Sequence, residues 1–176
     1  MQLIHSMFAQ KAWANKALFN ALGELSPGEH AEPLHTMIRT LNHIYVVDRI
    51  FQAHLLGQSH GYQSTNTSET PELAALQFDV AELDAWYMQY ASGVSASELS
   101  ESLAFRFTDG DEGSMSREEM LVHVVMHGAY HRGNVGQVLK SISVAPPRDL
   151  YTKFLHESEP QRRRAWQAVL AGAASA

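Results

Sequence analysis

Residues 120–133 read MLVHVVMHGAYHRG, and the expected fold and the expected site both follow from this stretch. It carries three histidines, His123, His127 and His131, each four residues after the last. Side chains four residues apart lie one turn apart on one face of a helix, so two such imidazoles can reach a single cation. Imidazole is a good ligand for divalent transition metals. The stretch therefore predicts a helix that carries a candidate metal site.

The helix around these histidines is expected to run from Arg117 to about Ile142. Ser116 and Glu119 have the spacing of a capping box at its start, and the proline pair at 146–147 prevents its continuation. Helical spacing places one set of residues in a single stripe: Met120, Val124, His127, His131, Val135, Val138 and Ile142. Two of the histidines thus belong to the apolar face that packs into the core.

An imidazole on an apolar face needs a partner, either another core group or a shared metal. The i, i+4 pair His127 and His131 favours the metal. Each four-residue step drifts by roughly 40° around the helix, so the three histidines together span roughly 80°. That spread is too wide for easy convergence on one ion. His123 is therefore expected at the edge of the site, in a surface or hydrogen-bonding role.

Three further long helices are expected from the apolar spacing. They lie at Leu3–Leu22, at Leu34–Leu56, and from Pro71 to about Ala91 with Thr70 as N-cap. Residues 57–69 between the second and third are small and polar, which indicates a surface loop or mobile flap. The second helix is apolar on several sides, which favours a central, buried position.

Shorter elements complete the expected fold. Leu103, Phe105 and Phe107 alternate with other residues before Asp109-Gly110, a pattern typical of a short β-excursion with a turn. Small C-terminal helices are expected at Leu150–Leu155 and from Pro160 to about Leu170, followed by a frayed tail at 171–176. The prediction is an all-α antiparallel four-helix bundle forming one domain over residues 1–170.

Composition narrows the classes of function. The formal net charge of −6 argues against nucleic-acid binding, and the short basic run Arg162–Arg164 is typical of a solvated helix face. No apolar run reaches the length of a membrane span and no signal peptide is visible, so a cytoplasmic protein is expected. The chain has no cysteine, which excludes disulfides, iron–sulfur clusters and a protein thiol nucleophile. Any thiol chemistry requires an external thiol.

A third ligand would come from another helix, and His43 in the apolar second helix is the candidate, since it too needs a partner. His54 shares the stripe of His43 but lies three turns away, too far for the same ion. The remaining histidines occupy polar or terminal contexts and are expected to be bystanders: His5, His30, His35, His60 and His156.

Residues 41–51 read LNHIYVVDRIF, and residues 123–139 run from His123 to Leu139 through the three histidines. These two segments resemble the first and second signatures of the DinB-like family of bacterial helical-bundle metalloproteins. Trp13-Ala14-Asn15 is similar to its first helix, and residues 149–155 to the segment after the last bundle helix. The resemblance covers roughly residues 3 to 156 and implies a four-helix bundle.

The resemblance also implies that the metal is held by His43, His127 and His131, with His123 outside this set. The chain departs from the family at Asn134, where the family often has glutamine. The shorter amide puts any hydrogen-bonding role of that position in doubt.

Three neutral imidazoles would leave the +2 charge and at least one coordination position available, which is typical of a catalytic site. That position can lower the pKa of a water to roughly 7 or deprotonate a thiol, and nickel, zinc or iron would fit. Tyr45 and Asp48 are weaker ligand candidates. Asp48 points roughly 140° away from His43, which favours a salt bridge to Arg132 or another buried cation. Arg132 is expected to anchor helices or a substrate anion.

Four functional hypotheses follow. The first is a metal-dependent transferase that activates a low-molecular-weight thiol toward a small-molecule substrate; the family resemblance implies thiol-dependent transferases and isomerases. The second is a metal-dependent hydrolase. The third is a non-catalytic metal-binding stress-response module, acting as a homodimer. The fourth is a helical bundle with core histidines and no metal.

Overall fold

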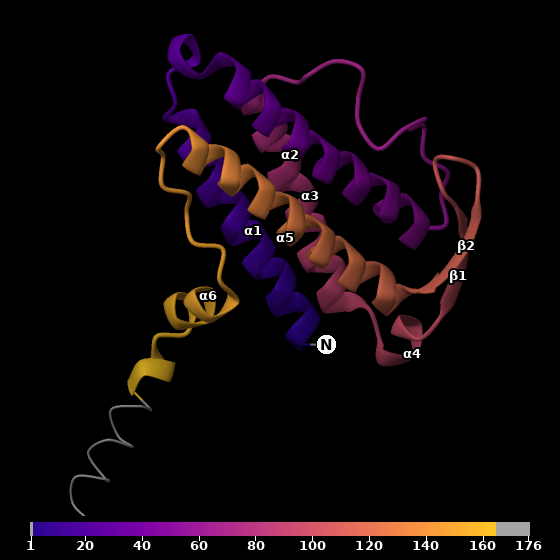
Figure 1. Ribbon diagram of the computed structural model, residues 1–176. Coiled ribbons are helices and arrows are strands. Elements are labelled where there is room, and N and C mark those ends of the chain that lie inside the picture. The colour runs from indigo at the N-terminus through magenta and orange to yellow at the C-terminus, as the bar shows by residue number, and fades with distance from the viewer. Residues whose placement is uncertain (1, 165–176) are drawn as a thin grey trace, which may run out of the picture.

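The computed structural model describes residues 2–164, and its four long helices form a bundle (Figure 1). They are α1 (Gln2–Gly23), α2 (Pro27–Leu55), α3 (Leu73–Gly93) and α5 (Arg117–Ser141). The short elements are α4 (Ala96–Leu99), β1 (Ser102–Arg106), β2 (Glu112–Ser116) and α6 (Tyr151–Ser158). The predicted fold class is confirmed. Among residues 2–164, no helix combines the length and apolarity that crossing a membrane requires.

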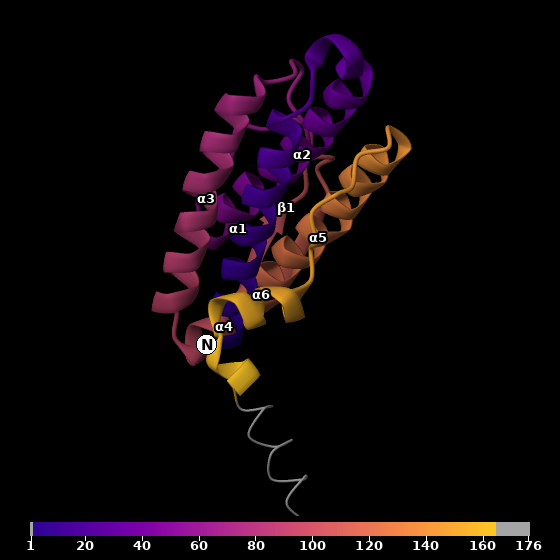
Figure 2. The same ribbon diagram turned by 90° about the vertical axis from the view of Figure 1, so that its left-hand side faces the viewer.

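The helices pack as two close antiparallel pairs, α1 with α3 and α2 with α5 (Figures 1 and 2). Arg117, which opens α5, donates hydrogen bonds to the carbonyl oxygen of Leu55 at the end of α2 (2.6 Å) and to the hydroxyl of Tyr90 near the end of α3 (2.8 Å). α2 and α3 thus end at the same end of the bundle. The segment 56–72, which connects α2 to α3, runs back along the length of the bundle (Figure 1). These two helices therefore point the same way.

Two apolar clusters fill the bundle, and buried polar groups lie between them. Along α1, Phe8 belongs to the first cluster and Leu18 to the second, with Lys11 and Asn15 in between. Lys11 Nζ lies 2.8 Å from Asp48 Oδ2 and 2.6 Å from Asp84 Oδ1. Burial lowers the pKa of Lys11, but the two carboxylates outweigh burial and raise it above its usual value. One buried ammonium thereby joins α1, α2 and α3.

The predicted start of α2 at Leu34 is wrong, because the helix begins at Pro27. Ser26 is its N-cap residue and Pro27 occupies the first turn, where a missing N–H costs little. His30 has non-helical dihedral angles (φ −125°, ψ 29°), so a kink separates this first turn from the rest. Pro33 follows the kink, and the hydrogen bond it cannot donate would have crossed the kink to Glu29.

The predicted start of α3 is wrong by two residues, since Glu72 and not Thr70 is its N-cap residue. The hydroxyl of Thr70 instead forms a 2.9 Å hydrogen bond with Nε2 of His35 on α2. Helix α4 was not expected, although Ser95 and Glu98 form a capping box at its start. The capping box predicted for Ser116 and Glu119 is present at the start of α5.

The predicted β-excursion is an antiparallel hairpin that pairs Leu103 with Met115 and Phe105 with Gly113. The ring of Phe105 lies over Gly113, where a Cβ atom would come within 2.8 Å of it.

The predicted helix at 150–155 is α6, which extends to Ser158. Residues 161–164 are helical, whereas the rest of the helix expected at 160–170 and the tail at 171–176 lie outside the described residues.

Candidate metal centre

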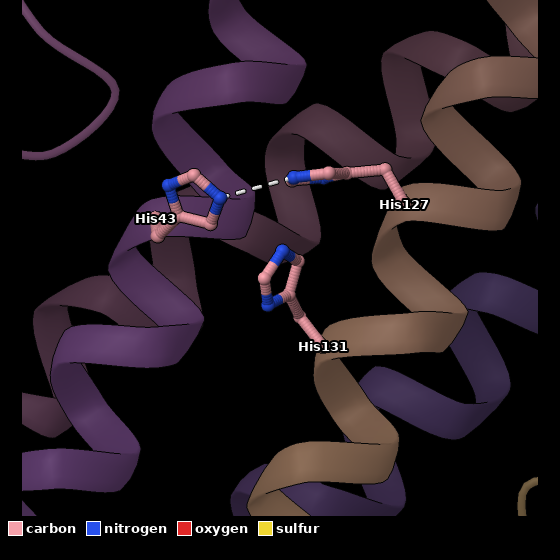
Figure 3. Close-up of side chains that lie close together, drawn as sticks. All are labelled: His43, His127 and His131. Carbon is pink, nitrogen blue, oxygen red and sulfur yellow. Dashed lines mark hydrogen bonds between the residues drawn. The ribbon is translucent and has the colours of Figure 1, made fainter.

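The structure brings His43 of α2 together with His127 and His131 of α5 (Figure 3). One ligand nitrogen from each ring lies within 4.8 Å of those of the other two. The ring centroids are 4.9 Å apart for His43 and His127, 4.6 Å for His43 and His131, and 4.5 Å for His127 and His131. The antiparallel packing of α2 on α5 places His43 of one helix opposite His127 and His131 of the other.

Local sequence explains how the three rings reach one place. Ile44, next to His43, is buried in the core, as are Val124 and Val135, which flank the histidine pair on α5. These neighbours fix both helices against the interior, and the histidines lie at the partly exposed edge of the α2–α5 contact. The site is therefore held by rigid helices and is open to solvent on one side.

A backbone carbonyl fixes the tautomer of His43. Its Nδ1 lies 2.7 Å from the carbonyl oxygen of Thr65 in the segment between α2 and α3. A carbonyl can only accept, so Nδ1 carries the hydrogen and donates it. In the neutral ring, the lone pair of Nε2 is then directed at His127, as a metal ligand requires.

Side-chain hydrogen bonds hold this segment against α2. Asn42 Nδ2 donates to Oδ1 of Asn66 and to the hydroxyl of Thr67 (2.6 Å), and Asn66 Nδ2 donates to the carbonyl oxygen of Arg39 (3.0 Å). Sequence reasoning treated residues 57–69 as a surface loop or mobile flap and missed Thr65. The run of Ser, Thr and Asn at 64–68 was the available signal, because such side chains commonly bond nearby backbone groups.

His127 is the most strongly perturbed of the three. Burial, followed by the neighbouring His131 and His43, lowers its pKa to about 3, and burial and His43 also lower the pKa of His131. Both rings are therefore neutral at neutral pH. His127 Nε2 lies 3.0 Å from His43 Nε2. Since the latter carries no hydrogen, His127 Nε2–H is the donor between them.

This geometry fits a divalent cation. Two imidazole nitrogens face each other at 3.0 Å with one hydrogen between them, and that hydrogen can move to the other nitrogen of His127. Within residues 2–164, Nδ1 of His127 is buried without a hydrogen-bond partner. An ion between the rings would use both Nε2 lone pairs, together with that of a third neutral imidazole. The residues present thus match the needs of such a group.

Asn134 lies beside the third histidine, with its Nδ2 at 3.5 Å from His131 Nδ1. Rotation of the amide by 180° offers Oδ1 in place of Nδ2, so that Nδ1 of His131 can donate and Nε2 stays free. The shortened amide therefore still reaches the ring, at the limit of hydrogen-bond distance.

His123 lies outside the group of three. Its ring packs on Phe51, with centroids 4.6 Å apart, and on His127 at 5.5 Å, and burial lowers its pKa. His54 packs on His60 and Phe105, with ring centroids 5.3 Å and 4.8 Å away, and Phe51 lies between this cluster and His123. Neither His54 nor His60 belongs to the group formed by the three metal-ligand candidates.

The weaker ligand candidates face elsewhere. Asp48 forms the expected interhelix salt bridge, but its partner is Lys11 and not Arg132. Burial raises the pKa of Asp48 to about 6, even though Lys11 opposes that shift. Tyr45 points toward α3, where it lines a hollow with Arg49 and Asp79.

Arg132 was expected to anchor helices or a substrate anion, and in the structure it anchors helices. Its Nε donates to Oδ2 of Asp149 at 2.7 Å, and Nη1 lies 3.4 Å from Oδ1 of Asn15. It thereby ties α5 to α1 and to the segment that follows α5. Sequence reasoning missed Lys11 as the partner of Asp48. Helical spacing along α1 could have found it, because Lys11 falls in the stripe Ile4, Phe8, Lys11, Asn15 and Leu18.

The DinB family model matches residues 1–164, a span that includes α1 through α6 and all three clustered histidines. The chain belongs to the DinB family. It is similar to Protein DinB of Bacillus subtilis (strain 168), with 22% identity over 169 residues, covering 89% of this chain and 95% of that protein. The predicted family membership is thus confirmed for this DinB family member, and the match covers most of the chain.

Proposed function

We propose that this protein binds a divalent transition-metal ion through His43, His127 and His131 and is a metal-dependent enzyme. The observation that carries the proposal is the convergence of three ligand nitrogens from two helices within 4.8 Å of one another. Membership of the DinB family supports it. Nickel, zinc and iron are the proposed metals, because imidazole ligands suit all three.

The protein's own groups prepare this site. The Thr65 carbonyl orients His43, and the lowered pKa values of His127 and His131 keep those rings neutral at neutral pH. Within residues 2–164, no further His, Asp or Glu joins the group. Three protein ligands are typical of a catalytic site, whereas structural zinc usually has four. The partly exposed edge of the α2–α5 contact is where a substrate would approach.

The proposed reaction is transfer of a low-molecular-weight thiol to a small-molecule electrophile: a sulfur–carbon bond forms, the bond from that carbon to its leaving group breaks, and the thiol proton and the leaving group pass to solvent. A metal ion at this site would act as a Lewis acid that lowers the pKa of a thiol or a water. The chain has no cysteine, so the thiol is a separate molecule. The three histidines are the binding residues in this proposal, and their neutral charge preserves the full positive charge for the incoming anion.

Metal binding is tested first, by elemental analysis and calorimetry on purified, untagged protein. We expect about one equivalent of metal in the parent protein and its loss in His43→Ala, His127→Ala and His131→Ala. His123→Ala is the matched control, because this histidine lies one turn from His127 and outside the group. It should retain metal. No metal in the parent, after reconstitution, would support a bundle with core histidines alone.

Catalysis is tested by following thiol consumption in the presence of electrophiles after loading with zinc or nickel. The proposal predicts metal-dependent turnover that His127→Ala abolishes and His123→Ala retains. Turnover unchanged by His127→Ala would contradict it. Metal-dependent ester cleavage without a thiol would favour the hydrolase, and full occupancy without turnover on either substrate class would favour the non-catalytic module.

A further inference from the structure

A cavity of about 270 Å³ lies between α1, α5 and the segment 146–149. Ala129 and Gly136 line it from α5, and both are roughly 180° around the helix from His127. The cavity is therefore separate from the three clustered histidines and lies on the opposite face of α5. Nothing in the proposed function depends on it.

The cavity exists because both helices carry small residues here. Ala14 contributes from α1, and Ala129, Gly133 and Gly136 contribute from α5. A Cβ atom at Gly133 would meet nothing within 4 Å, and one at Gly136 would meet only Pro146, at 3.5 Å. Larger side chains could thus be accommodated in part of this space, so packing alone does not require these glycines.

The lining is strongly positive in a chain whose formal net charge is −6. It contains Arg132, Lys140 and Arg148 with a single carboxylate, Asp149. Arg132 Nε and Gln10 Nε2 both donate to that carboxylate, so Arg132 already neutralises it. Neither Lys140 nor Arg148 forms an ion pair within residues 2–164. Their charge is therefore available to a ligand.

Arg132 also has a donor to spare. Its side chain is 2% exposed, and its Nη2 is buried with no hydrogen-bond partner within residues 2–164. A buried guanidinium ordinarily has its donors satisfied. The planar arrangement of these donors matches the oxygens of a carboxylate or phosphate group. Arg132 lines the cavity, and its buried Nη2 would have to turn toward the cavity to meet an acceptor there.

We propose that the cavity binds a small molecule with a carboxylate or phosphate group on a short apolar body. The exposed Lys140 and Arg148 would contact the anionic group, and the buried Arg132 would add its spare donor by turning toward it. Leu18, Pro146 and Pro147 provide the apolar walls. The volume admits only a small metabolite, since it lies just below the usual range for ligand pockets.

Nuclear magnetic resonance of the full-length protein tests the proposal, with phenylphosphate, benzoate and benzyl alcohol as probes. We expect saturable shifts of the backbone amides of Gly136, Lys140 and Arg148 with at least one anionic probe. Benzyl alcohol, which has a similar body and no charge, should bind about tenfold more weakly or not at all. Comparing the two anions decides between phosphate and carboxylate.

Variants locate the site. Lys140→Gln/Arg148→Gln should weaken binding by about tenfold, and Gly133→Leu should weaken it by occupying the cavity. Lys16→Gln/Arg106→Gln removes the same charge from exposed positions elsewhere and should leave affinity unchanged. Circular dichroism confirms that each variant is folded. Equal weakening in both double variants, shifts confined to the surroundings of His43 and Thr65, or no saturable shift with either anion would overturn the proposal.

Discussion

His43 Nδ1 donates a hydrogen bond to the carbonyl oxygen of Thr65, 2.7 Å away. This contact joins the candidate metal centre to a segment without helix or strand, and it sets which nitrogen of His43 faces the other two rings. Metal-binding histidines usually have such a partner on their second nitrogen, and its loss commonly weakens metal binding by about 10- to 100-fold. Thr65, in the segment 56–72, is therefore part of the candidate site.

Loosening this segment should weaken metal binding without touching a ligand. Asn66→Ala removes the bond that Asn66 donates to the Arg39 carbonyl and the bond that it accepts from Asn42. We expect about tenfold weaker metal binding, measured by calorimetric titration, because the Thr65 carbonyl is held less firmly when only the Asn42–Thr67 and Arg39 contacts remain. Ser68→Ala, at an exposed position of the same segment, is the control. Equal affinity in both variants would show that the bonds of Asn66 do not support the metal centre.

Metal-free protein should lose stability in acid through His127. Its folded pKa of about 3 lies below the unfolded value of about 6.5, so the unfolded chain binds the additional proton in this range. The free energy of unfolding should fall as the pH drops below 6.5, by at most about 1.4 kcal/mol per pH unit from this residue. The raised pKa of Asp48 acts in the opposite direction below pH 6, because its folded form takes up a proton first.

Comparison with a variant isolates the histidine contribution. Urea unfolding at pH 7 and pH 5, in the presence of a chelator, should show a smaller loss of stability in His127→Gln than in the parent. His156→Gln, on the exposed side of α6, should behave like the parent. The same loss in His127→Gln and in the parent would contradict the assignment.

Removing the buried ammonium should cost more than removing an exposed one. Lys11→Met leaves Asp48 and Asp84 buried without their cation, and we expect a loss of about 3–5 kcal/mol in the free energy of unfolding. Adding Asp48→Asn should recover part of that loss, since one uncompensated charge disappears. Lys16→Met, at an exposed position, should change stability by less than about 0.5 kcal/mol. Chemical denaturation measures all three, and similar losses for Lys11 and Lys16 would contradict the network.

Two glycines of α5 should respond differently to alanine. At Gly133 a Cβ atom meets nothing within 4 Å, so alanine should stabilise by about 0.5–1 kcal/mol through helix propensity. At Gly128 it would come within 3.0 Å of Arg132 Nη1 and 3.4 Å of Lys11 Cε. The buried polar groups would have to shift, so Gly128→Ala should lose most or all of that gain. Thermal unfolding of the two variants compares them directly, and equal stabilisation would contradict close packing at Gly128.

The features predicted correctly from sequence are the local ones. The capping box of Ser116 and Glu119 and the spacing of His127 and His131 depend on residues within one or two turns. The start of α2 was mistaken because Pro27 and Pro33 both suggest interruption, whereas a kink at His30 accommodates them. The contacts between residues of different helices were harder to predict from the sequence.

Contacts between residues far apart in the sequence could not be predicted from the sequence pattern alone. His43 was a candidate because an imidazole in an apolar helix needs a partner, but its placement opposite His127 depends on how α2 packs on α5. The family resemblance supplied that pairing. The contact with the Thr65 carbonyl could not be predicted, because every residue has a backbone carbonyl and the residue type does not show which one bonds to His43. The choice of Lys11 over Arg132 for Asp48 depends on the arrangement of three helices.

The most direct test is a crystal structure of the zinc-loaded protein, with anomalous diffraction measured on both sides of the zinc absorption edge. We expect one anomalous peak at about 2.0–2.1 Å from a nitrogen of each of His43, His127 and His131, with Nδ1 of His43 still bonded to Thr65. His123 should not contact the ion. A peak bound by His123 in place of His43, or no peak among the three rings in protein that contains zinc, would contradict the proposed centre.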